Sequence, residues 1–174
     1  MKNRILFFLM LFSFVVPCAA QQTCQLELKD APSFFNLKLG MTEEQVRDEI
    51  GKELKFKPKK KSKERTFFQN FITKPPPVIL PNVRALYLRF SSHRLYQIEI
   101  FYENRPEWQT LAEFTSSLAA TNHFPNALWT IGADKAEVKC VNFTLFADNV
   151  LNPRIELTDD AANTKVLEAR KKQR

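Results

Sequence analysis

The acidic side chains that could take part in acid–base catalysis are scattered along this chain of 174 residues. Catalysis of this kind needs two groups held close together with shifted pKa values. The candidates instead fall on separate predicted strands, helices and turns: Glu99, Glu103, Glu107, Glu113, Asp159 and Asp160. We interpret them as solvated charges.

The other residue types used in catalysis are equally sparse. His93 and His123 lie far apart in the sequence, so neither an HExxH motif nor a three-histidine metal site is available. Ser91 and Ser92 precede His93, but neighbouring side chains in a turn point apart and no third group completes a triad. Only three glycines are present, which excludes the glycine-rich phosphate-binding loops. We therefore expect no metal, no cofactor and no enzymatic activity.

The first twenty residues, MKNRILFFLMLFSFVVPCAA, have the three parts of a secretory signal. A positively charged start leads into the apolar stretch Ile5–Val16, which is too short to span a bilayer well. We expect cleavage after Ala20 and export to the periplasm or the extracellular space. The alternative is a lipid anchor on Cys18, although Pro17 occupies the position where a bacterial lipobox has a small residue.

Removal of the signal leaves two cysteines, Cys24 and Cys140. An even pair in an exported protein is most simply one disulfide. The loop that it closes has more than a hundred residues, for which the chain-entropy model gives a stabilisation of roughly 4–5 kcal/mol. Redox chemistry would need a CxxC motif or a base beside the thiol, and the sequence shows neither.

The most unusual stretch is the basic run Lys52–Arg65, KELKFKPKKKSKER, which holds eight Lys/Arg and two Glu. Two interpretations stay open: a solvated loop that keeps the protein soluble, or a docking patch for lipid headgroups, cell-wall polymer or an acidic protein face. Nucleic acid is a poor partner for an exported protein. The candidate binding residues are Lys55, Lys57, Lys59, Lys60, Lys61, Lys63 and Arg65.

Two helices are predicted from local patterns. The first spans Glu43–Ile50, and the spacing of Thr42 and Gln45 is that of a capping box, in which each side chain bonds the other residue's backbone. The second has about 14 residues in an amphipathic pattern, opens near Pro106 and ends near Asn122. We expect the capping residues to be structural.

The strands are predicted from branched and aromatic residues. Val83–Phe90 and Arg94–Glu103 are separated by a three-residue turn, which predicts an antiparallel hairpin with one buried face. A second pair of strands is predicted at Ala136–Ala147 and Arg154–Thr158. The segment from Phe67 to Ile72 reads as a strand or an apolar patch.

The predicted order is helix, hairpin, helix, hairpin. It favours the α+β class, with an antiparallel sheet that has helices packed on one face. A composition of 44% hydrophobic and 26% charged residues indicates a globular chain. The predicted segments are a signal peptide (1–20), a single domain (21–158) with half-repeats at 34–103 and 104–158, a basic and proline-rich excursion within it (52–81), and a C-terminal tail (159–174) with at most a frayed helix.

The stretch LKLGMTEEQV from Leu37 to Val46, closed by Gly51, resembles the LGMT-x-x-x-V…LG opening of the BamE/SmpA family of small outer-membrane assembly lipoproteins. The same fold, repeated in tandem, occurs in the β-lactamase inhibitor proteins. The resemblance covers about 15 residues. It implies a small exported domain whose helices pack on an antiparallel sheet and which binds other proteins rather than catalyses.

These observations together predict an exported, non-enzymatic binding or assembly protein of the bacterial cell envelope. Its partner is expected to be a protein or an anionic envelope component, with at most peripheral membrane contact. One alternative is a protein-inhibitor module of the β-lactamase inhibitor type, and another is a small exported hydrolase without a recognisable motif. The oligomeric state stays open.

Overall fold

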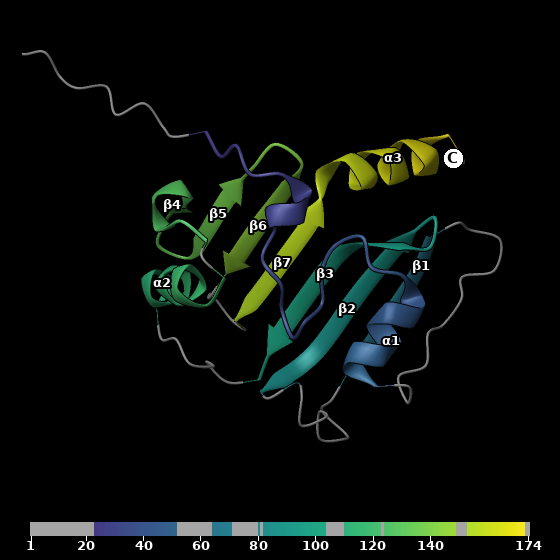
Figure 1. Cartoon of the computed structure of the whole chain (residues 1–174), viewed down its shortest axis with the longest axis horizontal. Helices are drawn as coiled ribbons and strands as arrows, with labels where there is room; N and C mark the ends of the chain where they lie inside the picture. The colour runs from purple at the N-terminus through teal and green to yellow at the C-terminus, as the bar shows by residue number, and fades with distance from the viewer. Residues whose placement is uncertain are drawn as a thin grey trace, which may run out of the picture.

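The computed structural model describes residues 23–51, 64–70, 80, 82–103, 110–122, 124–148 and 153–172. Its centre is a single antiparallel sheet of seven strands in the order β1-β2-β3-β7-β6-β5-β4, shown in Figure 1. The strands are β1 (Glu64–Asn70), β2 (Val83–Ser91), β3 (Arg94–Tyr102), β4 (Thr130–Ile131), β5 (Lys135–Lys139), β6 (Phe143–Asp148) and β7 (Arg154–Asp159). The helices are α1 (Glu43–Ile50), α2 (Leu111–Asn122) and α3 (Asp160–Lys171), with short 3-10 turns η1 (Leu28–Asp30) and η2 (Asn126–Leu128).

Two antiparallel meanders, β1–β2–β3 and β4–β5–β6–β7, join edge to edge to make this sheet. The join is between β3 and β7, where Gln97–Phe101 pairs with Arg154–Thr158. The predicted hairpin of β2 and β3 is confirmed. Because β3 and β7 are hydrogen-bonded neighbours, the regions predicted as two halves share one continuous sheet.

The predicted order of helix, hairpin, helix, hairpin is wrong, although the α+β class stands. The sequence predicts one strand over Ala136–Ala147, a stretch that contains no glycine or proline. It is instead a hairpin of β5 and β6 that turns at residues 140–142, where Val141 is 56% exposed. The strands β1 and β4 extend the sheet at its two edges.

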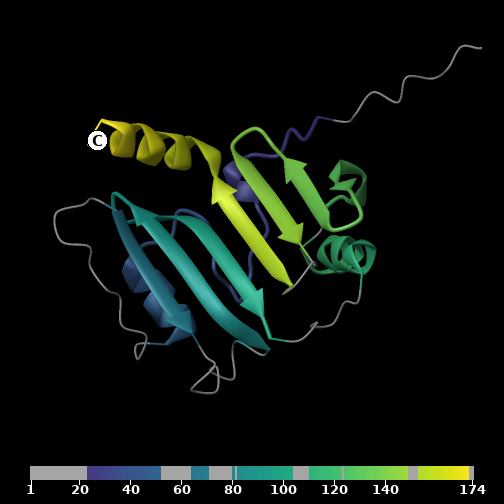
Figure 2. The same ribbon diagram turned by 180° about the vertical axis from the view of Figure 1, so that it is seen from behind.

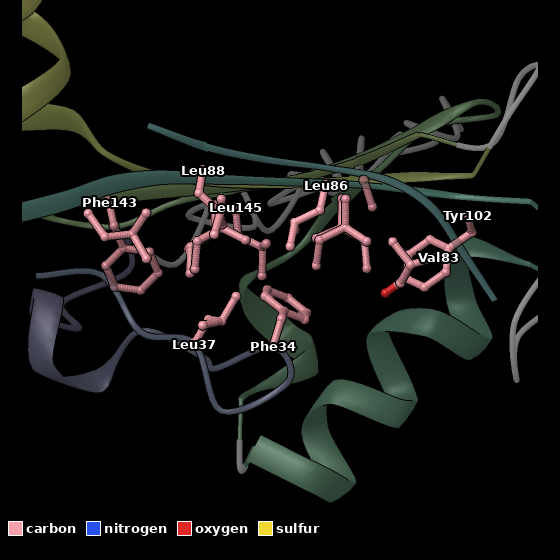
Figure 3. Close-up of a cluster of buried hydrophobic side chains, with 14 of the residues drawn as sticks. Phe34, Leu37, Val83, Leu86, Leu88, Tyr102, Phe143 and Leu145 are labelled. Carbon is pink, nitrogen blue, oxygen red and sulfur yellow. The ribbon is translucent and has the colours of Figure 1, made fainter. Parts of the chain in front are cut away.

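One face of the sheet carries the hydrophobic core. Leu86, Leu88 and Leu145 point from the strands toward this side and are fully buried, as Figure 3 shows. Phe34 and Leu37, from the segment that precedes α1, fill the space beneath them. Both α1 and α2 contribute buried apolar residues to the same cluster, so the segment before α1, α1 itself and α2 cover this face.

The first helix is built as its sequence predicts. The Thr42 side chain accepts a hydrogen bond from the Gln45 backbone, and the Gln45 side chain accepts one from the Thr42 backbone. Gly51 ends the helix with φ +105°, a conformation that other residues rarely adopt. Backbone hydrogen bonds between residues 40–41 and Leu95 attach the start of this helix to β3.

The expectation that all helices lie on one face is also wrong, because α3 borders the opposite side of the sheet. The C-terminal segment, for which the sequence predicts a tail with at most a frayed helix, forms α3 over Asp160–Lys171. Asp159 caps this helix by accepting a hydrogen bond from the Ala162 backbone. Of the helices that the structure describes, none is both long and apolar enough to cross a membrane.

Candidate functional site

The side of the sheet opposite the core, which we call the outer face, is formed by the alternate residues of each strand. Because Leu86, Leu88 and Phe90 point into the core, Tyr87 and Arg89 between them point to the outer face. Among the described helices, α3 alone borders this face, as Figure 2 shows from behind. In the described part of the chain, the outer face therefore presents strand side chains with α3 at its border.

Aromatic rings and one arginine form a continuous line across five strands of the outer face. Phe68 of β1 stacks on Tyr87 of β2 with ring centroids 4.2 Å apart, and Tyr87 meets Phe101 of β3 edge-on at 5.7 Å. The guanidinium of Arg154 on β7 lies 5.9 Å from the Phe101 ring and 5.1 Å from the Phe146 ring of β6. We call these five residues the aromatic row. Phe68, at its edge, is 45% exposed.

Beside the aromatic row, Glu99 is held between two arginines. Its two carboxylate oxygens lie 3.4 Å from Nη2 of Arg89 and 3.2 Å from Nη1 of Arg154. Arg154 also pairs with Asp148 at 3.3 Å. Burial and the neighbouring Glu156 carboxylate raise the pKa of Glu99, against the opposing effect of the two arginines.

The polar network continues through Gln97. Its side-chain oxygen accepts a hydrogen bond from Arg89, and its amide nitrogen donates to Glu156 and, at 3.1 Å, to the Thr158 hydroxyl. Gln97, Glu99 and Thr158 are all buried. Polar groups that are buried and mutually bonded hold one another in a single arrangement. The network therefore gives the aromatic row a rigid support.

A cavity of about 440 Å³ lies between the outer face and α3. Its polar lining comes from both sides: Thr66, Tyr87, Arg89 and Tyr96 of the sheet, and Asn163 and Arg170 of α3. Burial raises the pKa of Tyr96, and so does the Glu64 carboxylate, to which its hydroxyl donates at 3.3 Å. No motif or spacing in the sequence indicates this cavity or its lining residues as a candidate site.

No protein-family model, no characterised protein and no solved structure matches this chain. The outer face therefore has to be interpreted from its own geometry.

Those carboxylates singled out in the sequence that the structure describes are not brought together at one site. Glu99 lies in the polar network, while Glu113 bonds the Thr110 backbone before α2. Asp159 caps α3, and Asp160 accepts a hydrogen bond from the Thr144 hydroxyl at 2.9 Å. Within the described ranges, no three His, Cys, Asp or Glu side chains are grouped so that they could hold a metal ion. Glu107 and His123 lie outside those ranges.

The histidine and serines of the β2–β3 turn also stand apart from the outer-face network. Ser92 and His93 have positive φ values of 49° and 64° and are exposed. Both residues form the tight turn between the two strands, so their backbone conformation accounts for their position. Nothing in the described chain orients the imidazole toward a hydroxyl.

Of the predicted basic docking residues, only one falls within the described chain. Arg65 lies on β1, and its Nη1 is 3.1 Å from Oε2 of Glu43 on α1. The six lysines, Lys55, Lys57, Lys59, Lys60, Lys61 and Lys63, lie outside the described residues. The anion-docking interpretation of the run therefore remains a prediction.

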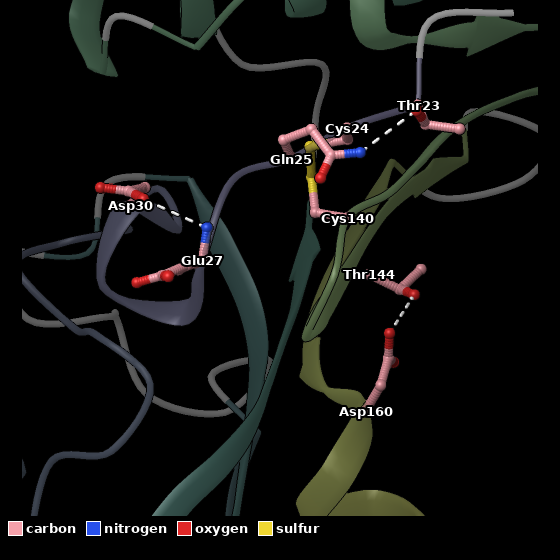
Figure 4. The surroundings of a disulfide bond; sticks show 8 residues. All are labelled: Thr23, Cys24, Gln25, Glu27, Asp30, Cys140, Thr144 and Asp160. Atoms are coloured by element: carbon pink, nitrogen blue, oxygen red, sulfur yellow. Dashed lines mark hydrogen bonds between the residues drawn. A yellow bond between two sulfur atoms is a disulfide. The ribbon is translucent and has the colours of Figure 1, made fainter.

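Cys24 and Cys140 form a disulfide, with Cα atoms 4.5 Å apart, as Figure 4 shows. Cys140 lies in the turn after β5 rather than within a long strand. The bond attaches the start of the described chain to the β5–β6 hairpin. It therefore fastens the segment that covers the core at its N-terminal end.

The residues that matter most on the outer face carry no motif. Arg89, Phe101, Phe146 and Arg154 occupy outward positions on four different strands. Alternation within each strand could have identified these positions individually. These side chains come into contact only because β3 pairs with β7, and no local sequence pattern predicts that pairing.

Proposed function

We propose that this protein is an exported, non-enzymatic binding protein of the bacterial cell envelope and that a partner protein docks on its outer face. The observation that carries the proposal is the aromatic row, from Phe68 through Tyr87, Phe101 and Arg154 to Phe146. Tyrosine, phenylalanine and arginine are the side chains enriched in protein–protein interfaces. Here they lie on a sheet face that α3 borders and that neither α1 nor α2 covers.

The support beneath the aromatic row favours binding. Arg154 is fixed by Glu99 and Asp148, at 3.2 and 3.3 Å, while it contacts two rings of the row. Side chains that are already ordered lose little conformational entropy when a partner binds. A rigid row with an exposed ring at one end is therefore suited to act as an anchor.

The envelope location and the assembly role rest on other features. The signal-like leader and the Cys24–Cys140 disulfide agree with an oxidising compartment outside the cytoplasm. The LGMT opening resembles that of small assembly lipoproteins, and in this chain it builds the start of α1 and its attachment to β3. These features favour a role in holding other proteins.

The test is partner capture from an envelope extract with the native protein and two single variants. Phe68→Ser removes the exposed end of the aromatic row. Ile131→Ser is the control and removes a hydrophobic side chain from β4, at the other edge of the sheet. The exposed fraction of Ile131 is 47%, close to the 45% of Phe68. We expect one partner to be retained by the native protein and by Ile131→Ser and to be lost with Phe68→Ser at unchanged melting temperature. A partner retained equally by all three proteins would show that the outer face is not the docking surface.

The captured partner also decides between assembly and inhibition. If the protein is an inhibitor module, the partner is an enzyme, and adding the native protein but not Phe68→Ser lowers its turnover. Glu99 gives the hydrolase alternative no support, because both of its carboxylate oxygens are engaged by arginines.

A further inference from the structure

We propose that the cavity between α3 and the outer face is a binding site for a neutral, hydroxyl-rich ligand, namely a sugar of one or two rings. The cavity shares Tyr87 with the aromatic row, but the binding of a ligand in it does not depend on the docking of a protein partner. Its volume of about 440 Å³ falls within the range of about 300–1,000 Å³ that is typical of small-molecule sites.

Three polar side chains of the cavity lining have unused hydrogen-bonding capacity. They are the Thr66 hydroxyl, the Tyr87 hydroxyl and the Asn163 amide, contributed by β1, β2 and α3. Among the described residues, none of the three side chains has a hydrogen-bond partner. Hydroxyl and amide groups both donate and accept, so together they match a ligand whose hydroxyls also do both.

The charges around the cavity favour a neutral ligand over an anion. Arg89 and Arg170 both line it, but each is paired with a carboxylate: Arg89 with Glu99 at 3.4 Å, and Arg170 with Glu64 at 2.7 Å. An anion would have to compete with these carboxylates for the guanidinium groups. A neutral ligand leaves both pairs intact and can still accept hydrogen bonds from the remaining guanidinium N–H groups.

The aromatic side chains of the lining complete the match. Tyr87 contributes a half-buried ring beside the polar groups, whereas Tyr96 is almost fully buried and offers the ligand little ring surface. A sugar ring has apolar C–H surfaces as well as hydroxyls, so it can use a ring and a polar group at the same time. A small inorganic anion would use only the polar groups and would leave most of the cavity unfilled.

The experiment is calorimetric titration of the native protein with defined probes. The neutral probes are maltose, cellobiose and di-N-acetylchitobiose, and the anionic probes are glucuronate and inorganic phosphate. We expect saturable binding of at least one neutral disaccharide. Binding of the anionic probes alone, or of none of the five, would overturn the proposal.

Two variants and a control test the location of the site. Asn163→Ala and Thr66→Val each remove one unused polar group, and we expect each to weaken the bound disaccharide about three- to tenfold. Asn142→Ala, in the exposed β5–β6 turn, should bind it as the native protein does. Equal affinity in all four proteins would place the ligand elsewhere. Asn163→Ala, which lies on α3 outside the aromatic row, should weaken the sugar and keep the protein partner, so the two proposals can fail separately.

Discussion

Arg170 near the end of α3 and Glu64 at the start of β1 form a two-point ion pair although 106 residues separate them. Arg170 Nε lies 3.0 Å from Oε2 of Glu64, and Nη2 lies 2.7 Å from Oε1. The Tyr96 hydroxyl donates to the same carboxylate from β3. These contacts join the far end of α3 to the sheet, and Arg170 and Tyr96 also line the cavity.

Arg170→Gln should loosen this end of α3. Because the Arg170 side chain is about half exposed, we expect the loss of the pair to cost only about 0.5–1 kcal/mol in the free energy of unfolding. Hydrogen exchange of the α3 amides should become faster, most of all in the last two turns. Lys171→Gln removes the same charge from the neighbouring position and is the control. Identical exchange in the two variants would show that the ion pair does not hold the helix.

Removal of the disulfide should destabilise the fold strongly. Cys24 and Cys140 are 116 residues apart, so the chain-entropy model assigns the bond a stabilisation of roughly 4–5 kcal/mol. Urea unfolding of the native protein with and without a reductant should show this difference, and a Cys24→Ser, Cys140→Ser variant should reproduce the reduced state. Mass spectrometry of unreduced peptides provides the direct check, and two free thiols in exported protein would contradict the bond.

Thr42→Ala should lower stability without affecting binding. The Thr42 hydroxyl accepts a hydrogen bond from the Gln45 backbone at 3.2 Å at the start of α1. Loss of such a cap costs about 1 kcal/mol. Thermal unfolding measures the loss, and retention of the partner protein is scored in the same preparation. Thr42→Ser keeps the hydroxyl and should behave as the native protein; a binding loss at unchanged stability would make this residue a contact site.

Local patterns predict the parts of this fold that short-range interactions determine. The capping box of Thr42 and Gln45 is present, and the β2–β3 hairpin follows from two β-rich stretches around a three-residue turn. In both cases the interacting residues are neighbours in the sequence. The spacing of residue types therefore contains most of the information that is needed.

The outer face could not be predicted in this way because it depends on contacts between distant segments. The aromatic row needs β3 beside β7, which brings Phe101 next to Arg154. The cavity needs α3 to lie along the outer face, where Arg170 reaches Glu64. Neither pairing leaves a local pattern, because the residues of each strand or helix would have the same spacing whichever element lay beside it.

The stability contributed by Glu99 should fall as the pH rises. Its pKa is raised above the ordinary value of 4.5, chiefly by burial and then by Glu156. The folded state therefore retains this proton at pH values where the unfolded chain has released it, and this proton linkage makes the free energy of unfolding decrease with pH. This contribution to stability is fully present below pH 4.5 and is lost as the pH rises through the raised pKa of Glu99.

Glu99→Gln isolates this effect. The free energy of unfolding of the native protein minus that of the variant should decrease from pH 4.5 to pH 7, as measured by urea unfolding at several pH values. Glu168→Gln, on the exposed side of α3, controls for the removal of one negative charge. A difference that stays constant or rises with pH would show that the arginines outweigh burial at this carboxylate.

The basic run Lys52–Arg65 supports a separate prediction about membranes. Exposed like charges repel one another, and each Lys near an anionic bilayer contributes on the order of 1 kcal/mol of binding free energy. Arg65 is already paired with Glu43, so the seven lysines of the run carry this prediction. Their combined attraction could hold the protein at an anionic surface without insertion.

Co-sedimentation with anionic phospholipid vesicles tests the run at low and high salt. We expect the native protein to sediment at low salt and to be released at high salt, because salt screens exposed charges beyond roughly 8–10 Å. A variant in which five lysines of the run are changed to Gln should stay in solution: Lys57, Lys59, Lys60, Lys61 and Lys63. The matched control changes five lysines elsewhere and should sediment as the native protein does: Lys135, Lys139, Lys165, Lys171 and Lys172. If the two variants sediment equally, binding follows total charge, and the run serves only to keep the protein soluble.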